Sequence, residues 1–199
     1  MLFRSDGSLR FCMDYRTLNK VTIKDSYPLP RHKDLMDRLG GAKFFTSLDL
    51  RSGYWQCHVA EDSVAKTAFH TRYGLYEWTV LPMGLTNAPA TFMRVMKNLF
   101  TDLLDRSVIV FLDDVLVYSH TRDEHVQLLC MVFGKLHEHR SYCKLKKCSF
   151  FRTSTTFLGF NITPEGLKIS DTKVKSLQEW LQPTTMKQVQ SFLGFVQYF

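Results

Sequence analysis

The feature that most constrains this chain is a pair of adjacent aspartates, Asp113 and Asp114, inside the largely apolar run 108–118. The β-branched residues on both sides predict a strand, a two-residue turn and a returning strand. Turns of that length favour Asn-Gly or Asp-Gly, because both central residues need positive φ. Two like charges beside buried strands also cost free energy unless a cation offsets them. The segment is therefore either a solvated turn that carries two acids or part of a metal site that needs a third carboxylate.

Composition sets the broad class of the protein. The 199 residues are 45% hydrophobic and 23% charged, which is typical of a globular protein. The net charge of +7 favours a polyanionic partner. The odd number of cysteines, five without a CxxC pattern, favours reduced thiols and an intracellular setting. No apolar run approaches the roughly 20 residues of a membrane span, so no membrane partner is expected.

Asp49, near the end of a predicted strand over 44–50, is the candidate third carboxylate. Its alternative role is a cap for the segment that follows. Predicted helices over 90–104 and 124–138, with strands on either side, give the order strand–helix–strand–strand–helix–strand across 44–162, the last strand being 157–162. That is the order of a ferredoxin-like split βαβ sheet. Its two inner strands can lie side by side, which would bring Asp49 next to Asp113 and Asp114.

Further motifs flank these aspartates in a fixed order. They are RFCMDYR with LN at 10–16 and 18–19, YPLP at 27–30, SLDLRSGY at 47–54, LPMGLTNAPATF at 81–92, FLDD at 111–114, KCSF at 147–150 and FLG at 157–159. Together they resemble the reverse transcriptase of gypsy-type LTR retrotransposon Pol polyproteins, of which this chain would be a fragment. Any one motif is weak, but seven in order leave little room for coincidence.

The resemblance implies an α+β fold, the palm of a right-hand polymerase with partial fingers and the start of a thumb. Residues 1–24 and 57–88 would be the partial fingers, and 25–56 and 89–170 the palm. Residues 171–199 would begin the thumb or connection and be truncated.

The same resemblance implies RNA-directed DNA polymerase activity, the transfer of a nucleotide from a dNTP to a primer 3′-hydroxyl on an RNA or DNA template. Two Mg²⁺ ions, for which Mn²⁺ can substitute, would be held by Asp49, Asp113, Asp114 and the Leu50 carbonyl. Hard oxygen ligands suit these ions, and such a pair can activate the hydroxyl and stabilise the leaving phosphates. Lys147 would protonate the departing pyrophosphate as a general acid.

The residues that would bind substrates also follow from the resemblance. Arg4, Arg10, Tyr54, Met83 and Gly84 would contact the dNTP, with Tyr54 under the sugar to reject a 2′-hydroxyl. The alternative role of Tyr54 is ordinary core packing. Leu158 and Gly159 would grip the end of the primer.

The expected partners are an RNA or DNA template–primer, dNTPs, and the rest of a Pol polyprotein with RNase H and integrase domains. The expected location is the cytoplasm or a retroelement particle, with the nucleus not excluded. The main alternative function is a non-catalytic nucleic-acid-binding remnant of such a polymerase, and a two-metal nuclease is a more distant one. A zinc site is a further alternative, but its candidate ligands match no usual zinc spacing: His137, His139, Cys143 and Cys148.

Overall fold

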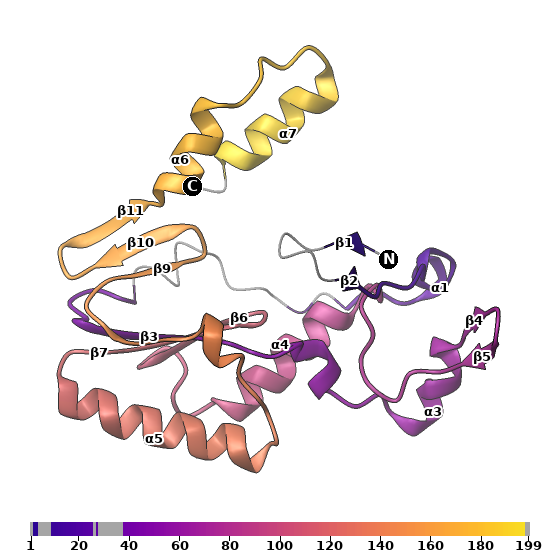
Figure 1. The fold of residues 1–199 in the computed structure, drawn as a ribbon, viewed down its shortest axis with the longest axis horizontal. Helices are drawn as coiled ribbons and strands as arrows, with labels where there is room; N and C mark the ends of the chain where they lie inside the picture. Colours follow the sequence, from indigo (N-terminus) through magenta and orange to yellow (C-terminus); the bar gives the residue numbers. More distant parts are fainter. Residues whose placement is uncertain (1, 4–8, 26, 28–37, 198–199) are drawn as a thin grey trace.

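The computed structural model describes residues 2–3, 9–25, 27 and 38–197. A central sheet with two long helices forms the middle of the molecule (Figure 1). A lobe of short elements lies at one end of this sheet, and a pair of helices, α6 (Asp171–Gln178) and α7 (Met186–Val196), stands away from it. In the described part of the chain, no helix has both the length and the apolar character needed to cross a membrane.

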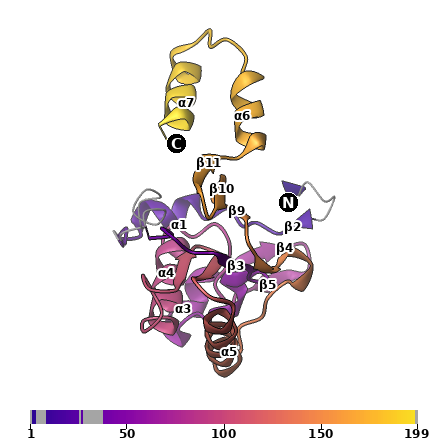
Figure 2. The same ribbon diagram turned by 90° about the vertical axis from the view of Figure 1, so that its left-hand side faces the viewer.

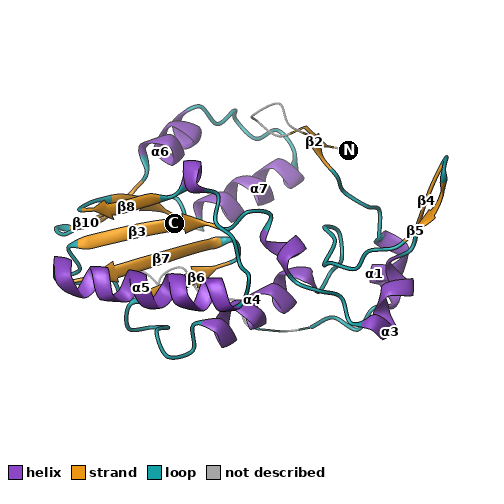
Figure 3. Cartoon of the chain, turned by 60° about the horizontal axis from the view of Figure 1, so that its bottom comes forward, coloured by secondary structure: helices purple, strands orange, loops and turns teal. Residues whose placement is uncertain are grey.

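The central sheet has four antiparallel strands in the order β6 (Val108–Phe111), β7 (Asp114–Ser119), β3 (Phe44–Asp49) and β8 (Ser149–Arg152). Figure 3 shows them side by side, with α5 in front. Along the chain, α4 (Ala88–Leu99) joins β3 to β6 and α5 (Arg122–Glu138) joins β7 to β8. This order and arrangement is the predicted ferredoxin-like split βαβ sheet, so the α+β palm-like fold class is confirmed.

Apolar side chains bury both faces of this sheet. Leu48, Val115 and Val117 pack with Phe92, Met96 and residues of α5 in one core cluster. On the opposite face, Phe45, Leu116 and Tyr118 pack with Phe157 and Ile162. Because the odd-numbered residues of β3 share one face, Asp49 lies on the same face as Phe45 and Ser47.

The last strand of the central sheet was predicted wrongly. β8 takes the place that was assigned to 157–162. Those residues instead contribute to β9 (Thr155–Phe157) and β10 (Phe160–Thr163), which form a separate antiparallel sheet with β11 (Gly166–Ile169). Leu158 and Gly159 turn the chain between β9 and β10 with φ of 51° and 83°. Two successive residues in the left-handed region cannot continue a strand, and glycine adopts that region without a steric penalty.

The helix predicted over 90–104 is α4, which begins two residues earlier and ends five residues earlier. Its C-cap is Phe100, and turns follow up to Ser107, with Asp105 at φ 66° among them. The apolar spacing continues past the helix because Phe100 and Leu103 are buried from these turns. The other predicted helix, α5, begins two residues earlier than expected, behind a capping box of Thr121 and Glu124.

The lobe beside the sheet consists of short elements. They are β1 (Leu2–Phe3), β2 (Leu9–Arg10), α1 (Arg16–Val21), a 3₁₀ turn η1 (Gly53–Gln56), α3 (Glu61–Val64), a 3₁₀ turn η2 (Ala65–Thr67), β4 (Phe69–Thr71) and β5 (Gly74–Tyr76). An aromatic cluster ties it together, with ring centroids of Phe11 and Trp78 5.8 Å apart and those of Trp55 and Trp78 5.9 Å apart.

Figure 2 shows α6 and α7 next to each other above the sheets. Trp180 joins them, with its ring centroid 5.7 Å from that of Phe192 and 5.1 Å from that of Phe195. The three regions fit the predicted partial fingers, palm and start of a thumb, but the exact boundaries stay a prediction.

Candidate active site

Three aspartates meet where β3 ends and β7 begins. Asp49 and Asp114 are Cα partners in the antiparallel ladder, and Asp114 also pairs with Phe111 of β6. The Leu50 N–H donates to the Asp113 carbonyl oxygen over 3.1 Å. The inner strands are therefore adjacent, as expected, and they bring Asp49 next to Asp113 and Asp114.

The turn between β6 and β7 consists of Leu112 and Asp113, so Asp114 opens the returning strand rather than sharing the turn. Leu112 has φ of 52°, which costs a branched residue about 1–2 kcal/mol. Its N–H donates to Met93 Sδ in α4 over 3.0 Å. Backbone strain of this kind collects at functional sites, and here it fixes where Asp113 projects.

Gly53 leaves the room that the Asp113 side chain occupies. A Cβ at this position would lie 2.5 Å from Asp113 Oδ1 and 2.8 Å from Phe92 Cζ, far inside van der Waals contact. Any larger residue at this position would have to displace the carboxylate or the Phe92 ring. Gly53 was not among the site residues predicted from the sequence, although its place four residues after Asp49 in the SLDLRSGY motif was a usable signal.

Lys147 reaches the site from the 3₁₀ turn η3 (Leu145–Lys147), with Nζ 3.4 Å from Asp49 Oδ2. The Lys144 N–H donates to the Asp49 carbonyl oxygen over 2.8 Å, which anchors this turn to the end of β3. Desolvation and the neighbouring Asp49 charge raise the pKa of Asp114, while Lys147 lowers it. The site thus concentrates negative charge that one lysine partly offsets.

The carboxylate oxygens of Asp49, Asp113 and Asp114 are ligands that suit a hard divalent cation, but the three side chains do not point toward one shared position. Among the residues that the structure describes, no three His, Cys, Asp or Glu side chains lie close enough together to hold a metal ion. Asp49 faces Lys147, and Asp113 lies over Gly53. A cation would relieve the like-charge repulsion that raises the pKa of Asp114. The fit therefore requires the carboxylates to turn toward a shared ion.

A pocket of about 470 Å³ opens beside the aspartates. Its lining brings together four of the predicted substrate-binding residues, Tyr54, Met83, Gly84 and Leu158, with Asp113 and Asp114. Gly159 follows Leu158 in the β9–β10 turn. Of the two predicted arginines, Arg4 lies outside the described residues, and Arg10 is described only through its backbone pairing in β2.

Tyr54 and Gly84 are held in place by different means. The Tyr54 ring packs edge-on against Phe92 at 5.3 Å between centroids. Gly84 has φ of 113°, and a Cβ there would lie 2.6 Å from the Met13 carbonyl oxygen. Both positions line the pocket, so packing of Tyr54 against the core and a role in substrate binding are compatible.

Asn19 and Asn87 are positioning residues that the sequence analysis missed. The Asn19 amide donates to the Gly84 carbonyl oxygen and accepts from the Thr86 N–H, both over 2.8 Å. Asn87 lies at the N-cap of α4 without capping it, and its side chain bonds instead to the Ile23 carbonyl and the Asp25 N–H. Their presence inside the LN and LPMGLTNAP motifs was the available signal.

The four candidate zinc ligands occupy a helix end and a loop. His137 lies in the last turn of α5 and His139 is its C-cap. Cys143 pairs with Leu50 in an isolated bridge, and burial raises the pKa of its thiol to about 11, with a smaller contribution from Cys148. A thiol that resists deprotonation is a poor zinc ligand.

Comparison with known proteins places the chain in a family. Residues 4–162 match the model described as reverse transcriptase (RNA-dependent DNA polymerase). The chain is 40% identical over 190 residues to the retrovirus-related Pol polyprotein from transposon 297 and 37% identical to that from transposon gypsy, both of Drosophila melanogaster. These matches cover 96% of this chain but 18% of each relative. An RNA-directed DNA polymerase homolog of Oenothera berteroana is 53% identical over 128 residues, which are 63% of this chain and 90% of the relative.

Solved structures agree with the sequence comparison. The foamy viral protease–reverse transcriptase in complex with double-stranded DNA superimposes with a TM-score of 0.90 at 30% identity, covering 99% of this chain and 34% of that one. The same protein in complex with an RNA/DNA hybrid gives a TM-score of 0.80 at 31% identity, over 93% of this chain and 25% of that one. By motif order, fold and similarity, this chain belongs to the reverse transcriptase family.

Proposed function

We propose that this chain carries the nucleotidyl-transfer site of an RNA-directed DNA polymerase, which adds a dNTP to a primer 3′-hydroxyl on an RNA or DNA template. The observation that carries the proposal is the pairing of Asp49 with Asp114 beside Asp113, at the edge of the pocket that Tyr54 and Met83 line. Acidic residues beside a nucleotide-sized pocket suit phosphoryl chemistry far better than passive binding.

Asp49, Asp113 and Asp114 would hold two Mg²⁺ ions or their Mn²⁺ substitutes, with the Leu50 carbonyl as a further ligand. Such ions, when bound, make the attacking hydroxyl more nucleophilic and neutralise charge on the phosphates. Gly53 and the Leu112 turn direct the Asp113 carboxylate, and Lys147 balances the charge of Asp49. Lys147 Nζ would then donate a proton to the leaving pyrophosphate.

The pocket would hold the incoming nucleotide. The Tyr54 ring, fixed edge-on against Phe92, would lie under the sugar and exclude a 2′-hydroxyl. Met83 and Gly84 would line the base and sugar, while the turn at Leu158 and Gly159 would hold the end of the primer. Arg4 and Arg10 remain proposed triphosphate ligands on the strength of the family resemblance alone.

The relatives support the proposed partners. The foamy viral enzyme is known in complexes with double-stranded DNA and with an RNA/DNA hybrid, which supports a template–primer duplex as partner. The retrotransposon relatives are longer polyproteins, which supports RNase H and integrase domains in the parent protein. Action in the cytoplasm or in a retroelement particle, with the nucleus not excluded, follows as part of the same proposal.

Extension of a DNA primer on an RNA template in the presence of Mg²⁺ tests the proposal. Asp113→Asn removes one carboxylate charge at constant volume, so extension should fall by at least about 100-fold. Asp105→Asn is the matched control, because Asp105 is exposed and asparagine tolerates its φ of 66°. Its ion pair with Arg38 lies at the surface and contributes little to stability.

Two results would count against the proposal. Equal activity of both variants would remove the aspartates from catalysis. A folded chain that binds template–primer but does not extend it, with or without Mn²⁺, would instead favour the non-catalytic nucleic-acid-binding remnant.

A further inference from the structure

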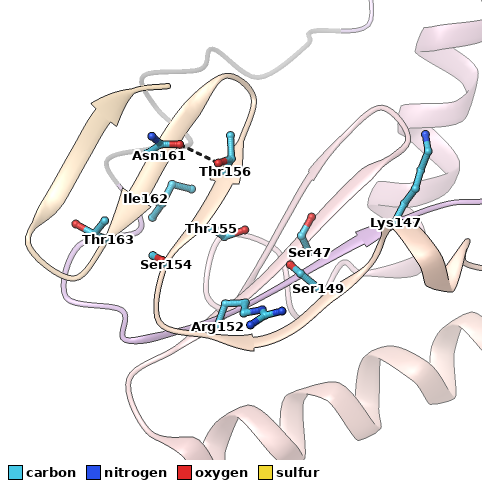
Figure 4. Close-up of a pocket in the computed structure, with 10 residues that line it drawn as sticks. All are labelled: Ser47, Lys147, Ser149, Arg152, Ser154, Thr155, Thr156, Asn161, Ile162 and Thr163. Carbon is cyan, nitrogen blue, oxygen red and sulfur yellow. Dashed lines mark hydrogen bonds between the residues drawn. The ribbon is translucent and has the colours of Figure 1, made fainter. Parts of the chain in front are cut away.

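A second pocket, of about 690 Å³, lies between β8 and the hairpin of β9 and β10 (Figure 4). Two cationic side chains, Lys147 and Arg152, line it together with hydroxyl and amide groups such as those of Ser47, Ser149 and Asn161. Among the described residues that form this lining, none is acidic and one, Ile162, is apolar. The pocket is thus positively charged, and of the active-site residues named above its lining includes Lys147 alone.

A β-bulge builds this lining. Ser149 and Arg152 are three residues apart and would point to opposite faces of a regular strand. They pair with Ser47 and Phe45, however, which are two residues apart and share a face, so β8 contains one extra residue. Phe151 provides it at φ of 49°, and its N–H donates to Thr46 Oγ1 over 3.2 Å. Local backbone strain therefore places Arg152 and Ser149 on the same side as Ser47.

Several polar groups of the pocket can donate to a ligand, although the Thr163 hydroxyl donates instead to the Gly166 carbonyl oxygen. Within the described part of the chain, no carboxylate forms an ion pair with Arg152. The Thr156 hydroxyl donates to Asn161 Oδ1 over 2.8 Å, which satisfies the amide acceptor and leaves its N–H groups as donors (Figure 4). Guanidinium, ammonium, hydroxyl and amide donors together match an oxyanion with several acceptor oxygens.

Lys147 connects this pocket to the aspartates. It lines the pocket and also lies 3.4 Å from Asp49, so one end of the cavity begins at the proposed site of nucleotide transfer. Arg152 pairs with Phe45, four residues before Asp49 on β3. A strand rises about 3.4 Å per residue, so these two positions lie about 14 Å apart along β3 and the two cations would contact separate phosphate groups.

We infer that the pocket between β8 and the β9–β10 hairpin binds phosphate groups, with Arg152 as its principal ligand beyond the active site. The phosphates belong either to the pyrophosphate released at Asp49 or to a nucleic-acid backbone, and the two sources share the same oxyanion chemistry. The pyrophosphate assignment rests on the proposed polymerase function, whereas the phosphate site itself does not.

Calorimetric titration of the folded chain with inorganic pyrophosphate, in buffer without divalent cations, tests the inference. Arg152→Gln should weaken binding at least about tenfold, since charge-assisted hydrogen bonds to phosphate are strong. The affinity of Arg152→Lys for pyrophosphate should lie between those of the unmodified chain and Arg152→Gln, because lysine keeps the charge but lacks the planar guanidinium. Arg106→Gln is the matched control, an exposed arginine in the turn before β6, and should bind like the unmodified chain.

A second titration with a short oligothymidylate separates the two sources. Weaker pyrophosphate binding alone in Arg152→Gln identifies the pyrophosphate source, and weaker oligonucleotide binding identifies a nucleic-acid backbone. The inference is overturned if Arg152→Gln binds both ligands with the same affinity as Arg106→Gln. It is also overturned if the unmodified chain binds neither ligand.

These titrations need no polymerase activity, so the inference and the proposed function fail separately. A chain that binds pyrophosphate through Arg152 but never extends a primer keeps the phosphate site and loses the polymerase. If the chain extends primers but binds pyrophosphate and oligonucleotide equally well without Arg152, the polymerase function is kept and the phosphate site is rejected.

Discussion

Asp49 and Asp114 lie directly opposite each other in the antiparallel pair of β3 and β7. Desolvation, and after it the repulsion between these two carboxylates, raises the pKa of Asp114. The fold therefore holds an unfavourable charge arrangement that a divalent cation would reverse.

Gly53→Ala should disable the site at modest cost to stability. The new Cβ must displace Asp113 Oδ1 and the Phe92 ring, so primer extension should fall at least tenfold while overpacking costs about 1–3 kcal/mol. Gly134→Ala is the control, because it lies within α5 with open space around its Cβ and should stabilise the chain by up to about 1 kcal/mol. Denaturant unfolding measures the change in stability of both variants, and primer extension measures the change in activity. Full activity of Gly53→Ala would show that Asp113 need not lie over Gly53.

Tyr54→Val should relax the choice of sugar. Loss of the ring that packs on Phe92 opens the floor of the pocket, so the ratio of ribonucleotide to deoxyribonucleotide incorporation should rise. Tyr54→Phe keeps the ring and should keep the discrimination. Steady-state incorporation of matched rNTP and dNTP pairs measures it. An unchanged ratio in Tyr54→Val would remove Tyr54 from a role in sugar selection.

Lys147→Ala should slow the chemical step by about 100-fold or more, the usual effect of losing a general acid. It should also move the acidic limb of the pH–rate profile to higher pH. The reason is that Lys147 lowers the pKa of Asp114, so its removal leaves the carboxylate protonated up to a higher pH. Lys146→Ala, the exposed neighbour in η3, should change neither property. A raised KM with an unchanged kcat would assign Lys147 to binding instead.

His125 should make stability depend on pH. Its ring is buried between the Thr46 and Ser119 hydroxyls, at 2.7 and 2.9 Å, and burial lowers its pKa below the ordinary value of 6.5. The unfolded chain then binds the proton more tightly than the folded one. Stability is therefore full above about pH 6.5 and declines as pH falls toward the folded pKa, by at most about 1.4 kcal/mol per pH unit.

His125→Asn should reduce this slope between pH 5 and 7, because asparagine does not titrate there. Urea unfolding across that range compares the two chains while the remaining histidines stay constant. Equal slopes would show that His125 keeps the same pKa in both states.

The sequence predicted three of the four central strands. The β-branched runs on each side of Asp113 and Asp114 indicated one hairpin, and the order of elements permitted the strand that ends near Asp49 to lie beside it. The pocket residues Tyr54, Met83 and Leu158 came from motif order alone, since they lie on separate elements far apart in the chain. No single-sequence period could have joined them.

The errors have local causes. β8 was missed because a bulge at Phe151 breaks the alternation expected of a strand, and only pairing with β3 reveals it. The predicted end of α4 was too late because buried residues of the turns that follow continue the apolar spacing of the helix. The strand over 157–162 was wrong because Leu158 and Gly159 both adopt positive φ. Gly53 was overlooked because its importance depends on where Asp113 points, which is a tertiary fact.

Binding of Mn²⁺, followed by electron paramagnetic resonance in the presence of an unreactive template–primer, tests the central claim most directly. No three candidate ligands in the described part of the chain are close enough to hold an ion as they stand, so the aspartates would have to turn toward one. It predicts saturable binding that weakens at least about tenfold in each of Asp49→Asn, Asp113→Asn and Asp114→Asn, but not in Asp105→Asn. Binding of equal strength in all four variants would contradict a shared cation site at the end of β3.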